Sequence, residues 1–247
     1  MSFSFFRPRP VTPDLSFIGV DMHSHLLPGI DDGLKTPEQT VAFVKELHAL
    51  GYKKLICTPH ILTGVHDNTP ETVGNALAIA RRALAEAEVP VELGAAAEYM
   101  IDDGLEMKID AKEKLLTIGD NYLLIEMSYM APPFNLNEVL FKLQMQGYKL
   151  ILAHPERYNF YHKDFQQLEN FRDRGILFQL NILSMSGYYG KEVKKACEKL
   201  IDAKMVEFIG TDMHHENHLG ATKAFTASKD FYKLVKDIPL MNMSLLK

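Results

Sequence analysis

The chain has 247 residues, and about 250 residues is typical of a single α/β barrel. Its 47% hydrophobic and 24% charged residues are those of a globular protein rather than a disordered one. The formal net charge of -5 gives no overall basic field, so we expect no nucleic acid partner. No apolar run approaches the ~18 residues that a membrane span needs, so we expect no integral membrane segment.

The cysteines and the N-terminus point to a reducing compartment. Cys57 and Cys197 are far apart and form no CxxC motif, which argues against a disulfide framework and a thiolate zinc site. Residues 1–16 contain two arginines and three prolines and lack the continuous apolar stretch of a signal peptide. We therefore predict a cytoplasmic protein with an exposed N-terminal arm at 1–16.

Strands and helices are predicted to alternate along the chain. Short apolar runs rich in β-formers predict seven strands, at 17–22, 54–58, 91–97, 122–127, 149–153, 176–181 and 206–211. Helical periodicity predicts helices at 36–50, 70–88, 136–146, 165–174, 191–203 and 221–235. Residues 102–119 are less regular and are interpreted as one inserted helix and a turn.

Helix boundaries support this alternation. Thr36 and Pro37 are typical of a helix start, and Gly51, Gly147 and Gly175 are each placed to end a helix before a strand. Repeated βα units imply a parallel sheet, and seven of them without a composition break favour a closed or nearly closed barrel in one domain, 1–247. An open, doubly wound sheet is the alternative.

Side chains that can bind metals follow almost every predicted strand. In chain order they are His23 and His25, His60, Glu98, Glu126, His154, and finally Asp212 and His214. The carboxyl ends of parallel barrel strands meet on one face, where barrel enzymes build their active sites. The sequence therefore predicts a site for several metal ions on that face.

Each motif alone has a simpler structural explanation. The pair His23 and His25 could be a hydrogen-bonded pair or part of a turn, and Asp31-Asp32-Gly33 could be an ordinary turn. Glu98 and Glu126 end buried strands, where a carboxylate needs either a metal or a cationic side chain as partner. The shared position at strand ends is what favours metal binding.

Together these motifs resemble a known family. They are similar to the motifs of the polymerase and histidinol phosphatase (PHP) superfamily. The matching positions are 21–33, 58–60, Glu98, Glu126, 154–158 and 210–214. Within it they resemble the bacterial tyrosine-protein phosphatases of capsule and exopolysaccharide gene clusters. The resemblance covers almost the whole chain.

The resemblance implies a distorted seven-stranded (β/α) TIM-like barrel, the PHP fold, with three divalent metal ions. It implies that His23, His25, Glu98 and Asp212 hold the first ion; Glu98, Glu126 and His154 the second; and Asp32, His60 and His214 the third. Such ligands suit manganese, our first choice, and also iron, zinc or magnesium. The implied catalytic residues are Arg157, Asp212 and His214.

The implied reaction is hydrolysis of a phosphate ester by metal-activated water, with no protein nucleophile. Neither cysteine begins a CxxxxxR loop, in agreement with this reaction. Arg157 is predicted to bind a phosphate oxygen, with a surface pair to Glu156 as the alternative. Many relatives have a further arginine after the last motif, but this chain has His215 and His218 there, either of which could replace it or lie in solvent, as could His66.

The implied substrate is phosphotyrosine in a protein, namely the tyrosine-rich tail of a membrane-bound bacterial kinase that controls polysaccharide synthesis. The metal site itself does not specify the alcohol. A small-molecule phosphatase, for example for histidinol phosphate, and a nuclease are therefore alternatives, although no basic, aromatic patch supports a nuclease. A metal-stabilised module that binds the kinase without turnover is the non-enzymatic alternative. The oligomeric state is not predicted.

Overall fold

The computed structural model describes residues 13–246, so most of the predicted N-terminal arm, 1–12, lies outside the described residues. Within 13–16 the predicted arm is wrong at Leu15. This side chain is fully buried, and its backbone N–H donates to the carbonyl of Leu50. The chain therefore joins the hydrophobic core at Leu15, two residues before the first predicted strand.

All seven predicted strands are present in the described residues, and every pairing between them is parallel. They are β1 (Val20–Asp21), β2 (Lys54–Cys57), β4 (Glu92–Ala95), β6 (Tyr122–Glu126), β7 (Lys149–Ala153), β8 (Leu177–Asn181) and β9 (Phe208–Gly210). Two short strands, β3 (His60–Ile61) and β5 (Glu98–Met100), continue the paths of β2 and β4.

The strands close into a barrel. One sheet has the order β1-β2-β4 and the other the order β3-β5-β6-β7-β8-β9, and the continuations β2 to β3 and β4 to β5 join the two. Beyond the last strand, Ser24 pairs with Met213, and the N–H of Asp212 donates to the carbonyl of His23. This contact between the first and last segments confirms the distorted seven-stranded barrel and contradicts the open-sheet alternative.

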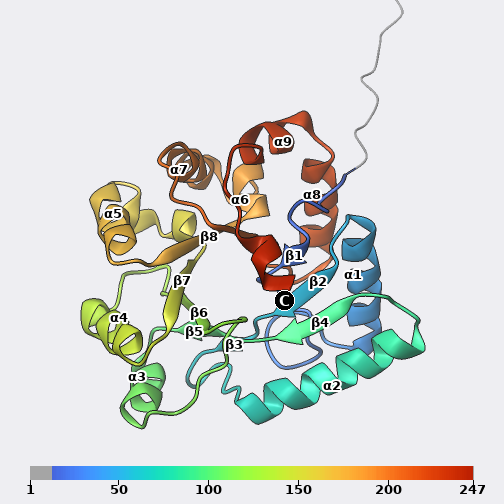
Figure 1. Ribbon diagram of the computed structural model, residues 1–247, viewed down its shortest axis with the longest axis horizontal. Coiled ribbons are helices and arrows are strands. Elements are labelled where there is room, and N and C mark those ends of the chain that lie inside the picture. The colour runs from blue at the N-terminus through green and yellow to red at the C-terminus, as the bar shows by residue number, and fades with distance from the viewer. Residues whose placement is uncertain (1–12, 247) are drawn as a thin grey trace, which may run out of the picture.

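Helices surround the strands (Figure 1). They are α1 (Pro37–Ala49), α2 (Pro70–Glu86), α3 (Asp103–Asp110), α4 (Leu136–Met145), α5 (Phe165–Asp173), α6 (Ile182–Ser186), α7 (Lys191–Asp202), α8 (Glu216–Thr226) and α9 (Lys229–Val235). The Thr36 side chain caps α1 as predicted. None of these helices is long and apolar enough to cross a bilayer.

One predicted helix is wrong. The segment 221–235 is the end of α8 followed by α9, not one helix. The His215 side chain accepts a hydrogen bond from the N–H of His218 and so begins α8 five residues before the predicted start. Ser228 caps α9 by accepting from the N–H of Phe231, and this capping conformation separates the two helices.

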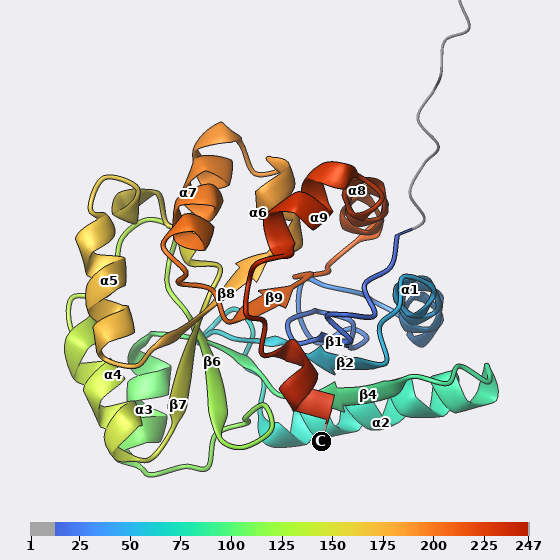
Figure 2. The ribbon, with the colours of Figure 1, turned by 45° about the horizontal axis from the view of Figure 1, so that its top comes forward.

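The barrel interior is apolar below the site. Val20, Ile56, Leu124 and Phe208 are buried in one cluster between the strands. At the amino ends of the strands, the 3-10 helix η3 (Asn242–Leu246) covers this cluster (Figure 2). The carboxyl ends of the strands are left for polar side chains.

Asn242 attaches η3 to the barrel. Its amide group is fully buried and donates to the carbonyls of Val20 and Ile209, at 2.9 and 2.7 Å. Its carbonyl oxygen accepts from the N–H of Ile209 at 3.1 Å. One side chain thereby joins the first strand to the last.

Candidate metal centre

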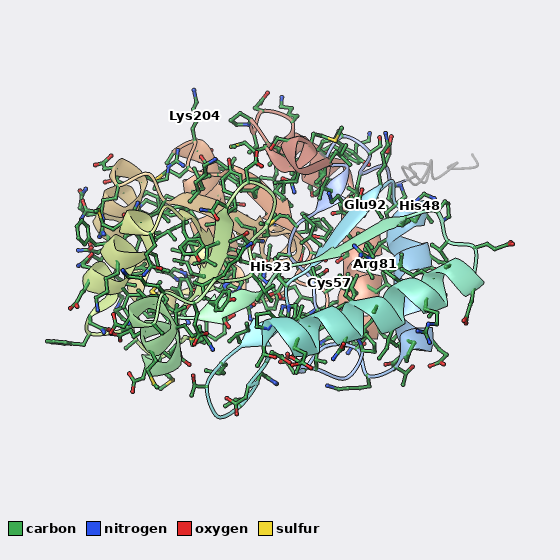
Figure 3. The ribbon with its side chains drawn as sticks, turned by 60° about the horizontal axis from the view of Figure 1, so that its bottom comes forward. His23, His48, Cys57, Arg81, Glu92 and Lys204 are labelled. Carbon is green, nitrogen blue, oxygen red and sulfur yellow. The ribbon has the colours of Figure 1, made fainter. Side chains whose placement is uncertain are left out.

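The structure brings all nine predicted metal ligands together. They form four overlapping groups, in each of which the possible ligand atoms lie within 4.8 Å of one another: His25, Asp32, His60 and His214; His23, His154 and Asp212; His23, His25 and Glu98; His60, Glu98 and Glu126. His23 lies in the middle of the molecule, among the strands (Figure 3). The grouping differs from the predicted one: His154 groups with His23 and Asp212 and not with Glu98 and Glu126, His60 groups with these two glutamates, and His25 also joins the Asp32 group.

Glu98 is the centre of the cluster. Its fully buried Oε2 atom lies 3.2 Å from His23 Nε2 and 3.2 Å from His60 Nδ1, and its Oε1 lies 3.0 Å from His154 Nε2. A carboxylate surrounded by imidazoles of three different strand ends is suited to bridge two cations.

Several of these atoms approach one another without hydrogen-bond geometry. Glu98 Oε2 and His60 Nδ1 are buried and have no hydrogen-bond partner, although His60 Nδ1 is only 2.8 Å from Glu126 Oε1. A buried polar atom without a partner is costly in free energy. Nitrogen and oxygen donors that face a common point are what a divalent cation requires, so the residues fit metal binding.

Buried amides of β8 orient two of the proposed ligands. Gln179 Oε1 lies 2.7 Å from His23 Nδ1, and its amide nitrogen donates to Asn181 Oδ1 at 2.9 Å. The Asn181 amide donates to Asp212 Oδ2 at 2.7 Å. With the proton on His23 Nδ1, the Nε2 lone pair and Asp212 Oδ1 remain available for a cation.

The two neighbouring aspartates, Asp31 and Asp32, have different positions. Asp31 is buried and its Oδ2 lies 2.8 Å from His25 Nδ1, so it orients this ring. Asp32 is partly exposed, and its Oδ1 lies 3.5 Å from His60 Nε2 and 3.4 Å from His214 Nε2. Gly33 is required here because a Cβ atom would lie 2.1 Å from the carbonyl of His25.

Two proposed ligands have left-handed backbones. His154 has a φ of 34° and Asp212 a φ of 50°. Residues other than glycine rarely adopt this conformation, and it is found where surrounding structure enforces it, often in active sites. His154 follows β7 and Asp212 lies shortly after β9, and the left-handed backbone at each residue directs its side chain into the same cluster.

The charges of the cluster stabilise one another. Burial opposes the charged form of His23, but the carboxylates of Glu98 and Asp212 outweigh it and raise the His23 pKa to about 9. Burial likewise opposes ionisation of Asp212, yet His23 and His214 hold its pKa well below the usual value. Without metal the His23 imidazole is therefore protonated at neutral pH, and metal binding has to displace this proton.

A pocket of about 270 Å³ opens over the cluster. Its lining includes Asp32, His60, Glu126, His154, Asp212 and His214, together with Tyr129, Arg157, Tyr189, His215 and His218. The Arg157 guanidinium lies over the rings of Tyr129 and Tyr189, 4.7 and 4.3 Å from their centres, and donates to Asp212 Oδ2 at 2.9 Å. The alternative of a surface pair with Glu156 is contradicted, because Glu156 is fully buried.

The additional histidines have different surroundings. His215 and His218 both line the pocket, and their rings lie 3.9 Å apart. His218 is mostly buried, and burial together with His215 lowers its pKa to about 4, so this ring is neutral. His66 stacks on the His60 ring at 5.7 Å and does not line this pocket.

Four further residues of the site were not singled out from the sequence: Gln179, Asn181, Tyr129 and Tyr189. The signal for the first two was present: the strand Leu177–Asn181 has polar residues at alternate positions in an otherwise apolar run, and it carried no predicted ligand. The tyrosines lie in loops, where the sequence alone does not fix side-chain direction.

Comparison with known proteins identifies relatives across most of the chain. A family model described as "Capsular polysaccharide synthesis, CpsB/CapC" matches residues 19–231. The chain is 28% identical to the tyrosine-protein phosphatase YwqE of Bacillus subtilis over 88% of this chain and 84% of that protein. It is 27% identical to the tyrosine-protein phosphatase CpsB of Streptococcus pneumoniae over 79% of this chain and 83% of that protein.

Solved structures give the same relationship. The fold matches a chain from the crystal structures of YwqE and CpsB, described as metal-dependent tyrosine phosphatases, with a TM-score of 0.76 and 26% identity over 89% of this chain and 92% of that chain. A lactonase from Listeria monocytogenes matches with a TM-score of 0.53 and 11% identity over 92% of this chain and 90% of that chain, which shows a shared fold alone.

Proposed function

We propose that this chain, which belongs to the CpsB/CapC family of capsular polysaccharide synthesis, is a metal-dependent protein-tyrosine phosphatase. The observation that carries this proposal is the convergence of nine metal-binding side chains beside Arg157 in one pocket. The names of the related proteins, tyrosine-protein phosphatases, support the substrate.

The proposed centre holds three divalent ions. His23, His25, Glu98 and Asp212 would hold the first, Glu98, Glu126 and His154 the second, and Asp32, His60 and His214 the third. The group of His23, His25 and Glu98 supports the first set, and the 3.0 Å between His154 Nε2 and Glu98 Oε1 supports the second. His60 also lies close to Glu98 and Glu126, and His25 lies close to the third set. The absence of cysteine from these groups leaves manganese, our first choice, together with iron, zinc and magnesium.

Bound divalent ions would supply activated water and neutralise the charge that develops on the phosphate. Arg157 would hold a non-bridging phosphate oxygen, because it lines the pocket and its guanidinium is fixed between two aromatic rings. Asp212 and His214 are the other two proposed catalytic residues, and they would hold the ions next to Arg157. A phenolate leaving group, with a pKa near 10, needs less protonation than an alkoxide, so phosphotyrosine requires no dedicated general acid.

The physiological substrate would be the tyrosine-rich tail of a membrane-bound bacterial kinase of polysaccharide synthesis, reached from the cytoplasm. The described cysteines support a reducing compartment, since both are free and buried.

Turnover tests the reaction class. Purified protein with added manganese is assayed with p-nitrophenyl phosphate, a phosphotyrosine peptide, histidinol phosphate and single-stranded DNA, with and without a chelator. We expect chelator-sensitive turnover of the first two. Faster turnover of histidinol phosphate than of the peptide would favour a small-molecule phosphatase, and no turnover of any substrate would favour a binding module.

The substitution Arg157→Ala tests the phosphate contact. Loss of one preorganised donor is expected to lower kcat/KM for the peptide by roughly 10²-fold. The metal content, measured by elemental analysis, should be unchanged, since Asn181 still holds Asp212 Oδ2. Loss of metal together with activity would show that Arg157 acts on the metal centre through Asp212 instead.

A further inference from the structure

An exposed apolar segment borders the catalytic pocket. It lies three residues after Glu126, between β6 and α4, and runs Tyr-Met-Ala-Pro-Pro-Phe from Tyr129 to Phe134 without a charged residue. Tyr129 lines the pocket itself. Met130 is 89% exposed, and Phe134 is fully exposed at 108%. Exposed apolar side chains that gather in this way mark a binding surface more often than isolated ones do.

A second hollow lies behind this segment. It has a volume of about 340 Å³. Its lining includes Pro132, Pro133 and Phe134 from the segment and Phe160 from the loop after β7, and Asp164 and Gln167 line its polar side. The two prolines restrict the backbone, so the hollow is formed before any partner binds. We call Tyr129, Met130, Pro132, Pro133, Phe134 and Phe160 the apolar rim.

The rim is continuous with the catalytic pocket through stacked rings. The fully buried Tyr158 ring lies 5.9 Å from the ring of Tyr129 on the pocket side and 5.6 Å from the ring of Phe160 on the side of the second hollow. The Tyr158 hydroxyl oxygen accepts a hydrogen bond from the N–H of Met127, the residue after β6, at 3.0 Å. One packed aromatic unit therefore forms a wall of both hollows.

The other side of the pocket is mixed in character. The adjoining groove, of about 360 Å³, has Lys35, Gln39, Glu216 and Asn217 in its lining, together with Leu34 and Phe43. A polypeptide that places one side chain in the pocket thus contacts this mixed groove on one side and the apolar rim on the other.

We infer that the apolar rim binds an apolar side chain of the polypeptide that flanks the phosphotyrosine. This inference rests on the proposed function, since the occupant of the pocket must be part of a polypeptide for its neighbours to reach the rim. An extended chain advances about 3.3–3.6 Å per residue, and alternate side chains point to the same side. A residue two positions from the phosphotyrosine is therefore suited to the rim.

Paired peptides test the inference. One peptide has leucine two positions before and two positions after the phosphotyrosine, and the other has serine at both places. Burial of a leucine side chain predicts that kcat/KM is about tenfold higher for the leucine peptide. The double variant Met130→Ser with Phe134→Ser should reduce this ratio to about one. The kcat/KM for p-nitrophenyl phosphate should stay within about twofold of the unsubstituted protein, because neither Met130 nor Phe134 lines the pocket that a small substrate occupies.

Met145→Ser is the matched control. Met145 is 71% exposed and belongs to α4, the helix that follows the rim segment. It is the last residue of this helix and lies before the amino end of β7. The leucine preference should remain about tenfold in this variant. Loss of the preference in the control, or its survival in the double variant, would overturn the inference.

Further outcomes separate this inference from the proposed function. Equal kcat/KM for the two peptides in the unsubstituted protein would refute the rim alone. Failure to hydrolyse both peptides and p-nitrophenyl phosphate would refute the proposed function and the rim with it. A change of molar mass in solution caused by the double variant but not by Met145→Ser would overturn the inference by showing that the rim joins two copies of the chain.

Discussion

The two ends of the barrel bury polar groups in opposite ways. At the amino end, both polar atoms of the Asn242 side chain have backbone hydrogen-bond partners. At the carboxyl end, Glu98 Oε2, His60 Nδ1 and His154 Nδ1 are buried without such partners. The Asn242 contacts are complete without a ligand, whereas the cluster at the carboxyl end has buried donors and acceptors that an additional group would satisfy.

This difference indicates which end of the barrel binds a ligand. The same strands supply both ends, and the same apolar cluster separates them. Unsatisfied polar atoms lower the stability of the fold. Their concentration in the metal cluster indicates that a ligand bound there restores this stability. The predictions that follow change one end at a time and ask whether the other responds.

The largest effect is expected at Glu98. Glu98→Gln removes the charge that three imidazoles surround, and the loss of several kcal/mol of charge stabilisation corresponds to a decrease of kcat/KM of roughly a thousandfold or more. Elemental analysis should show loss of bound metal as well. Glu92→Gln is the control, because Glu92 is an exposed residue near the amino end that pairs with Lys54. Equal metal content in the two variants would contradict the central position of Glu98.

The second effect concerns pH in the metal-free protein. Because the His23 pKa is raised from 6.5 to about 9 on folding, its stabilisation is fully present below pH 6.5 and is lost as the pH rises through 9. His23 alone should lower the free energy of unfolding by roughly 3 kcal/mol over that interval, and His25, whose pKa is also raised, adds to the fall. Urea unfolding of chelator-treated protein at pH 6 and pH 9.5 measures it.

The pH dependence should reverse when metal is present, because bound imidazoles are unprotonated and metal affinity rises with pH. His23→Gln is the control and should make the fall in the metal-free protein smaller. Asn242 contributes nothing to this dependence, since an amide does not titrate. A fall of the same size in His23→Gln would assign the effect to other groups.

A smaller effect is expected from Gln179, which orients His23 without being a proposed ligand. Gln179→Leu removes the partner of His23 Nδ1 and the donor to Asn181. Such changes behind metal ligands typically cost 10–100-fold in metal affinity or activity. Titration of the metal-free protein with manganese, followed by calorimetry, measures the affinity. Unchanged affinity would show that the Gln179 amide has no part in orienting the ligand.

The smallest catalytic effect is expected at the amino end. Asn242→Leu removes three hydrogen bonds and leaves backbone groups of Val20 and Ile209 without a partner, which should cost about 1–3 kcal/mol of stability. For a chain of this size, each kcal/mol lowers Tm by roughly 2–4 °C. Metal affinity and kcat should be unchanged below that temperature. A loss of metal affinity would show that the two ends are coupled.

Much of this architecture could be predicted because it depends on repeated local patterns. Apolar runs and helix ends indicated seven βα units, and the topology of a parallel barrel then placed side chains such as Glu98 and His154 on one face. What the sequence does not show is how segments between strands turn. The left-handed conformations of His154 and Asp212 depend on the surrounding fold, not on the preference of these residues.

The errors and omissions have the same origin. No proline or glycine interrupts 221–235, and the break depends on a side-chain cap at Ser228 that competes with the helix. The link from Gln179 through Asn181 to Asp212 joins two strands that are far apart in the sequence. Such pairs become visible only when the register between β8 and β9 is known.

The hydrogen bonds from Asn242 to Val20 and Ile209 determine how late in synthesis the barrel can close. During translation the first strand leaves the ribosome long before β9 and before Asn242, which lies 222 residues after Val20. Such long-range contacts form last and make folding slow. The nascent chain therefore has an incomplete set of imidazoles and carboxylates until β9 and Asn242 have been synthesised, and the full ion-binding constellation arises only then.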